Sequence, residues 1–179
     1  FAQEVLTLDD LSAGRLSIGI GVGGDLDNRM MGGSELTNRE RVDRFEEFVA
    51  LYDRALTTDS VSQAGRWFSA VDADLPLSGT QRPRVPVLLA ANGPRTLRFA
   101  AENADGWVTY GKPSESTSAA DEHAWWESLR VLSARLDDAL ASAGRSTEQF
   151  ERHLNLDSGP RLSLRSVDGF VDDVGRARE

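Results

Sequence analysis

The stretch from Leu88 to Leu97 is the part of the sequence whose residue types most clearly offer chemistry. An apolar run leads into Asn92-Gly93, Pro94 stands where a helix would begin, and Arg95 follows it. A Gly-Pro turn at a helix N-terminus directs backbone N–H groups outward, where the helix dipole favours a phosphate. The stretch therefore predicts a local anion site, with the alternative that glycine and proline serve only the geometry of the turn.

Other polar side chains stand in turns that would follow further strands. Asp25, Asp27 and Asn28 come after a glycine-rich segment and could approach a coenzyme ring or a substrate, with a carboxylate available for proton transfer. In the alternative interpretation they only cap turns of the loop. Thr109 and Lys112 stand at a further strand end, where Lys112 could pair with an anionic substrate group or simply remain solvated.

The two histidines are weaker candidates for acid–base chemistry. We predict His123 on the polar side of an outer helix and His153 at the beginning of a strand, the end that does not carry catalysis in a parallel barrel. No spacing of histidine with carboxylates predicts a metal site. The absence of cysteine excludes disulfides, a thiolate nucleophile and cysteine-ligated zinc, so redox chemistry would need a bound cofactor.

Composition bounds the class of protein further. The 179 residues are 40% hydrophobic and 27% charged, a balance typical of folded soluble domains. The sequence contains neither an apolar run long enough to span a membrane nor the layout of a signal peptide, so we expect a cytoplasmic location. The net charge of -9 argues against nucleic acid as a partner and leaves a small-molecule substrate, with a homodimer as the default assembly.

Helical and strand patterns alternate along the chain. Helices are predicted from Ala2 to Leu11, from the Thr37–Glu40 capping box to about 56, from Pro94 to about Ala104, from Ser118 to a stop at Gly144, and after Ser166. The long fourth helix should bury Trp125 or Trp126 with a leucine ladder, and the last helix should turn Val167, Phe170, Val171 and Val174 inward. Strands are predicted at 15–23, 85–91, 105–110 and near Leu154-Asn155-Leu156.

Two stretches lie outside this alternation. Residues 24–34 are predicted to form a loop, and residues 57–84 an insertion between barrel units, with an extended segment at Gly65-Arg66-Trp67-Phe68. The order of the remaining elements implies a parallel sheet with right-handed crossovers. Four such strands are about half of a closed (βα)8 barrel.

Several separated motifs make the sequence similar to the luciferase-like monooxygenase superfamily over nearly its whole length. The strongest match is Leu89-Ala90-Ala91-Asn92-Gly93-Pro94-Arg95-Thr96-Leu97, followed by Ala100-Ala101-Glu102-Asn103-Ala104-Asp105-Gly106-Trp107. Residues 8–16, Gly65-Arg66-Trp67-Phe68 and Gln81-Arg82-Pro83 also resemble the family and stand in the matching order.

The resemblance implies a (βα)8 TIM barrel, an α/β fold, that binds FMN or the deazaflavin coenzyme F420 at the carboxyl ends of its strands. We expect residues 1–179 to be a single partial barrel domain, covering the middle half to two-thirds and truncated at both ends. The Ala-Ala-x-Gly-Pro form resembles the deazaflavin branch, which includes sugar-phosphate dehydrogenases and methylene-tetrahydromethanopterin reductases. That likeness places the coenzyme phosphate near Ala90, Ala91, Asn92, Gly93, Pro94, Arg95 and Gly111.

The resemblance also sets the functional expectation. We expect an oxidoreductase that uses coenzyme F420 to transfer hydride to or from a small organic substrate. An FMN-dependent monooxygenase of the same fold is one alternative, and a non-catalytic barrel fragment is another. The catalytic histidine common in the deazaflavin branch lies in early strands and matches no residue here, which keeps the last alternative open.

Overall fold

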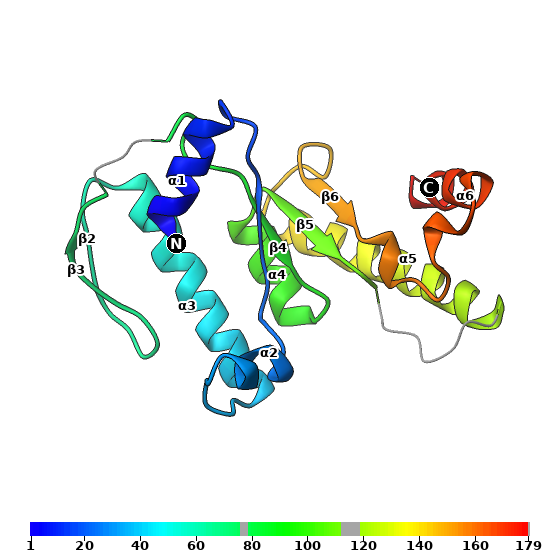
Figure 1. Cartoon of the computed structure of the whole chain (residues 1–179), viewed down its shortest axis with the longest axis horizontal. Helices are drawn as coiled ribbons and strands as arrows, with labels where there is room; N and C mark the ends of the chain where they lie inside the picture. The colour runs from blue at the N-terminus through cyan, green and yellow to red at the C-terminus, as the bar shows by residue number, and fades with distance from the viewer. Residues whose placement is uncertain (76–78, 112–118, 179) are drawn as a thin grey trace. The chain divides into compact units, whose positions relative to one another are not determined.

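The computed structural model describes every residue except 76–78, 112–118 and 179, so Lys112 lies outside the described residues (Figure 1). The chain divides into two compact units, Phe1–Val87 and Leu88–Glu179. Each unit is described by itself below.

The first unit combines helices with short strands. Its elements are α1 (Ala2–Leu11), β1 (Ile18–Ile20), α2 (Asp25–Met30), α3 (Asn38–Thr57), β2 (Val61–Ala64) and β3 (Ser69–Ala73). The capping box that begins α3 is confirmed, because Thr37 Oγ1 accepts from the Glu40 N–H at 3.2 Å and Glu40 Oε2 accepts from the Thr37 N–H at 3.1 Å. The buried face of α3 carries Phe45, Val49 and Tyr52.

Two predictions for the first unit were wrong. The expected loop 24–34 contains α2, whose first turn holds Asp25 and Asp27, where acidic side chains complement the helix dipole. The segment Gly65–Phe68 is not extended but forms the turn of the antiparallel β2–β3 hairpin. This turn is held by Glu47 of α3, whose carboxylate accepts from the N–H groups of three successive residues, 66–68, at 2.7–3.2 Å.

A buried carboxylate joins two stretches of the first unit that sequence comparison had matched separately. Asp9 of α1 is fully buried and accepts hydrogen bonds from the Thr80 and Gln81 N–H groups at 2.7 and 2.9 Å. The Gln81 side chain donates to Asp9 Oδ1 and to the Leu16 carbonyl, both at 2.8 Å. Burial alone raises the pKa of Asp9, but the hydrogen bonds from Gln81 and Thr80 outweigh burial and lower it.

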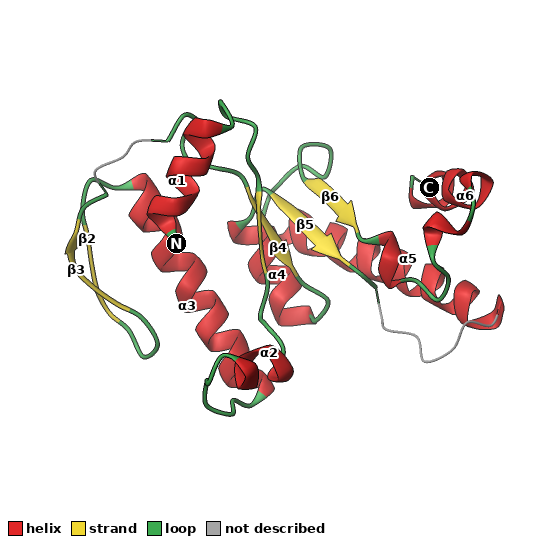
Figure 2. Ribbon diagram, viewed as in Figure 1, coloured by secondary structure: helices red, strands yellow, loops and turns green. Residues whose placement is uncertain are grey.

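The second unit contains the parallel sheet (Figure 2). Its elements are β4 (Val87–Ala90, beginning at the unit boundary), α4 (Pro94–Asn103), β5 (Gly106–Thr109), α5 (Ala119–Ser142), β6 (Glu151–Leu154), the 3-10 helices η1 (Leu156–Ser158) and η2 (Ser163–Arg165), and α6 (Val167–Ala177). β5 pairs in parallel with both β4 and β6. The predicted α/β architecture with a parallel sheet is therefore confirmed.

The register defines two rows of residues across this sheet. Leu88, Gly106 and Glu151 form one row, and Ala90, Val108 and His153 form the next row toward the carboxyl ends of the strands. The last strand begins three residues earlier than Leu154, where we had placed it. The prediction followed the apolar Leu154 and Leu156, whereas the hydrogen-bonded strand is made mostly of polar residues.

Helix α5 supplies much of the core of the second unit. Trp125 and Trp126 are both buried together with the predicted ladder Leu129, Leu132, Leu136 and Leu140. The predicted inward face of α6 is wrong, because Val167, Phe170 and Val171 are exposed. The opposite face of α6 packs instead, where Asp173 pairs with Arg165 of η2 at 3.0 Å.

A search of the described helices found none that combines the length and the apolar character of a membrane span.

Candidate coenzyme site

The turn between β4 and α4 presents an exposed helix N-terminus. Gly93 precedes the helix in an extended conformation, and its carbonyl accepts the first helical hydrogen bond from the Leu97 N–H at 2.9 Å. Thr96 Oγ1 accepts from the Gly93 N–H at 3.2 Å, which closes the first turn. Gly93, Pro94 and Arg95 are exposed. Since the N–H groups of a first helical turn point out of the helix, this turn can receive an anion.

A closed ring of three hydrogen bonds ties this turn to the end of β5. The buried Thr109 hydroxyl donates to Asn92 Oδ1 at 2.7 Å and accepts from the Gly111 N–H at 3.0 Å. Asn92 Nδ2 then donates to the Gly111 carbonyl at 3.1 Å. Three residues predicted to contact coenzyme or substrate are thus brought together. Thr109 is only 3% exposed with its hydroxyl engaged, a geometry that favours positioning of the turn over contact with a substrate.

Two tryptophans complete this arrangement, and the sequence gave no signal for their role. Trp107 Nε1 donates to the Ala91 carbonyl, and Trp125 Nε1 donates to the Tyr110 carbonyl at 3.1 Å. Gly111 has a φ of +71°, and a Cβ on this residue would lie 2.6 Å from Trp125 Nε1. Glycine is therefore required at 111 both by the backbone conformation and by the close approach of the indole.

The acidic candidates lie in the first unit, on α2. Asp25 pairs with Arg41 of α3, and Asn28 Oδ1 accepts from Arg44 Nη1 at 3.3 Å. Asp27 is exposed in the first turn of the helix. These contacts hold α2 against α3, and the role of the three side chains toward a coenzyme or substrate stays a prediction.

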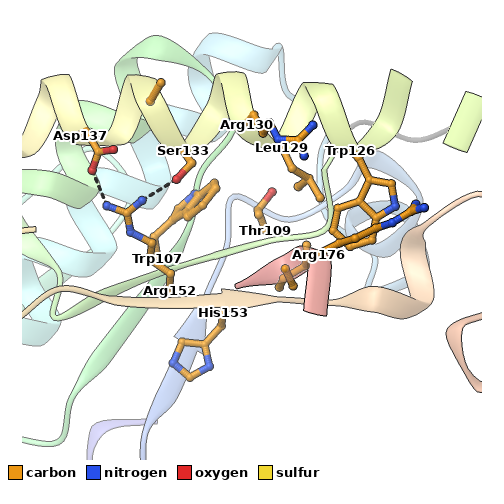
Figure 3. A pocket seen from close by; sticks show the side chains of 13 residues that line it. Trp107, Thr109, Trp126, Leu129, Arg130, Ser133, Asp137, Arg152, His153 and Arg176 are labelled. Atoms are coloured by element: carbon orange, nitrogen blue, oxygen red, sulfur yellow. Dashed lines mark hydrogen bonds and ion pairs between the residues drawn. The ribbon is translucent and has the colours of Figure 1, made fainter. Parts of the chain in front are cut away.

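A groove of about 330 Å³ lies on the face of the sheet that α5 covers (Figure 3). Arg152 of β6 donates to Ser133 and Asp137 of α5 there, and the Arg176 guanidinium lies 5.9 Å from the centre of the Trp126 ring. The charged groups of the groove thus take part in contacts between elements. We place the candidate site at the exposed turn instead, since parallel sheets bind ligands beyond the carboxyl ends of their strands.

Parallel strands, a strand-to-helix turn open to an anion and a buried network behind it define an α/β oxidoreductase of the barrel class. The chain belongs to the luciferase-like monooxygenase family, whose model matches residues 1–156. It is 30% identical over 152 residues to an F420-dependent glucose-6-phosphate dehydrogenase from Microbacterium testaceum strain StLB037. That match includes 84% of this chain and 41% of the relative, so the chain spans less than half of that protein's length.

Solved structures agree on the fold. An F420-dependent secondary alcohol dehydrogenase, solved with an F420-acetone adduct, superposes with a TM-score of 0.67 at 20% identity, over 86% of this chain and 43% of its own. The monooxygenase RslO1 from Streptomyces bottropensis gives a TM-score of 0.68 at 21% identity, over 99% of this chain and 51% of its own. The family thus includes both F420-dependent enzymes and monooxygenases.

Proposed function

We propose that this chain forms the coenzyme-binding part of an F420-dependent oxidoreductase that transfers hydride to or from a small organic substrate. The observation that carries the proposal is the exposed Gly93-Pro94-Arg95 turn, which begins α4 at the carboxyl end of β4 and is fixed to Gly111 through Asn92. The similarity to the F420-dependent dehydrogenase supports the choice of coenzyme.

The residues of the turn fit a phosphate group. A Cβ on Gly93 would meet only Thr96 Oγ1, at 3.6 Å, so the space in front of this backbone is open. The first turn of α4 contributes N–H donors and the positive end of the helix dipole, and Arg95 adds a positive charge. Ala90 and Ala91 add little bulk beside the turn, which lets a coenzyme approach the backbone.

The remaining residues of the site position the binding surface. The Asn92–Thr109–Gly111 ring keeps the ends of β4 and β5 at a fixed separation, which lowers the entropic cost of binding because the turn is already ordered. When bound, F420 supplies a two-electron carrier that accepts or returns a hydride. The chain's own residues bind and orient the coenzyme and leave the hydride chemistry to it.

An FMN-dependent monooxygenase is the second candidate. The RslO1 monooxygenase matches 99% of this chain with a TM-score of 0.68, as good a superposition as the F420-dependent alcohol dehydrogenase gives. Both coenzymes carry a phosphate, so the same turn would serve either one. The two functions differ in the ring system that the chain prefers.

The test is a fluorescence titration of the chain with F420 and with FMN, repeated on two glycine variants. Gly93→Val places a side chain in front of the turn in a backbone conformation that valine adopts readily. Gly175→Val is the matched control, because a Cβ at this position in α6 meets nothing within 4 Å.

We expect F420 to bind more tightly than FMN. Gly93→Val should weaken binding about tenfold or more, the equivalent of about 1.4 kcal/mol, and Gly175→Val should leave it unchanged. Preference for FMN would support the monooxygenase. Binding of neither coenzyme would refute both and leave a non-catalytic barrel fragment.

A further inference from the structure

A histidine–carboxylate pair lies on the face of the sheet opposite α5. His153 Nε2 is 3.0 Å from Glu151 Oε2, and both side chains project from the same face of β6. Arg152, between them, projects to the other face and reaches Ser133 and Asp137 of α5. Figure 3 shows this opposition, with Arg152 pointing toward α5 and His153 pointing away from it. The pair therefore belongs to the surface that α5 leaves uncovered.

His153 lies toward the carboxyl end of its strand, contrary to the sequence prediction. It is the third residue of the four-residue strand β6, whereas we had expected it at the beginning of a strand. The prediction placed β6 too late in the sequence. The corrected position puts the imidazole at the end of the sheet where parallel α/β folds carry their chemistry.

The register places this imidazole level with the candidate coenzyme turn. His153 pairs with Val108, and Val108 pairs with Ala90, the last residue of β4 before the turn. Two strand spacings separate Ala90 from His153, about 10 Å. Glu151 lies one row further from the carboxyl ends, beside Gly106, where a Cβ would be 2.8 Å from the Cβ of Glu151. The carboxylate thus lies behind the imidazole as seen from the coenzyme turn.

The surroundings leave the pair without a competing titratable group. On this face β4 contributes Leu88 and Ala90 and β5 contributes Gly106 and Val108, none of which titrates. The His153 and Glu151 side chains are 47% and 58% exposed, so both are accessible among the described residues. When Glu151 accepts a hydrogen bond from Nε2, the Nδ1 lone pair of the neutral ring is left to accept a proton, the arrangement of a base with its orienting group.

We propose that His153, oriented by Glu151, is the proton-transfer residue of this chain's oxidoreductase reaction, an inference that rests on the proposed function. In the oxidation of a hydroxyl-bearing substrate, His153 Nδ1 takes the O–H proton while the C–H bond breaks, the C=O bond forms and the hydride passes to F420. In the reverse direction His153 returns the proton to the carbonyl oxygen. His153 acts as the general base, and Glu151 is a positioning residue.

The first test is the rate of carbethoxylation by diethylpyrocarbonate, measured separately at the only two histidines of the chain. His123, exposed on α5, is the internal control. We expect F420 to slow modification of His153 severalfold and to leave His123 unaffected. F420 binding is measured by fluorescence in the same samples. If F420 binds without protecting His153, this inference is overturned while the proposed function stands; if F420 does not bind, the proposed function fails as well.

The second test separates proton transfer from structure. In imidazole ¹H–¹⁵N spectra, neutral His153 should be the Nε2–H tautomer, and Glu151→Gln should give a mixture while His123 is unchanged. With isopropanol as the probe substrate, His153→Gln should remove the rise of kcat with pH without changing F420 affinity, and His123→Gln should change neither. An unaltered pH profile or an unaltered tautomer would contradict the assignment, and if isopropanol is not turned over, protection and tautomer decide.

Discussion

Replacing Thr109 with valine removes one hydroxyl from the network that we place behind the coenzyme turn. Valine has nearly the shape of threonine, so the packing of β5 is retained. The lost hydroxyl is the donor to Asn92 Oδ1 at 2.7 Å and the acceptor for the Gly111 N–H at 3.0 Å. Both groups would be left without that partner.

The cost follows from the burial of those two groups. Gly111 is buried, so its N–H loses its acceptor without access to solvent, at about 1–3 kcal/mol. Asn92 is half-buried, so water replaces part of its lost hydrogen bond. The added methyl group returns about 0.8 kcal/mol. We therefore expect Thr109→Val to lower the free energy of unfolding by about 1–3 kcal/mol.

The assay is urea unfolding followed by tryptophan fluorescence, with Thr109→Ser as the matched variant. Serine keeps the hydroxyl and loses only a methyl group, so it should cost about 0.8 kcal/mol. Thr109→Val should also weaken F420 binding more than Thr109→Ser does, since the turn is no longer held. A serine variant as unstable as the valine variant, or a valine variant as stable as the parent chain, would refute the positioning role.

Two further predictions concern other fixed points of the two units. Gly111→Ala should cost about 2–4 kcal/mol of unfolding free energy in urea, because it adds a 2.6 Å contact with Trp125 to the strain of a left-handed backbone. Gly144→Ala has a similar φ of +68° with nothing within 4 Å, so it should cost only about 1 kcal/mol; equal losses would contradict the contact. Because the folded-state pKa of Asp9 lies below its ordinary 3.8, its ionised form contributes stability that is complete above 3.8 and is lost as pH falls through the lowered value. Asp9→Asn should therefore cost about 2 kcal/mol at neutral pH and flatten the acid-side loss of stability in urea titrations across pH, and an unchanged acid slope would show that Asp9 does not carry it.

The regular elements were predictable because their local signals agreed with their tertiary surroundings. The Thr37–Glu40 capping box, the apolar run before Asn92 and the glycine stop at Gly144 each mark an element boundary that the structure confirms. The prediction failed at β6, whose residues are mostly polar and gain their strand conformation by pairing with β5. Such pairing is a long-range contact that no local pattern contains.

The candidate site was predictable in part for the same reason. The turn at Gly93-Pro94 has a local signature, and the structure confirms its strand-turn-helix geometry. The ring that joins Asn92 to Thr109 and the Gly111–Trp125 contact connect residues far apart in sequence, so their roles emerged only from the folded chain. The orientation of His153 depended on the register of β6 and was unavailable from the sequence for the same reason.

The most direct test of the coenzyme site is a backbone ¹H–¹⁵N NMR titration of the chain with F420. We predict that the largest shifts fall on Gly93, Arg95 and Gly111, while Gly175 of α6 is unperturbed. Shifts confined to the groove residues Arg130 and Arg176, or no shifts at saturating F420, would contradict the account.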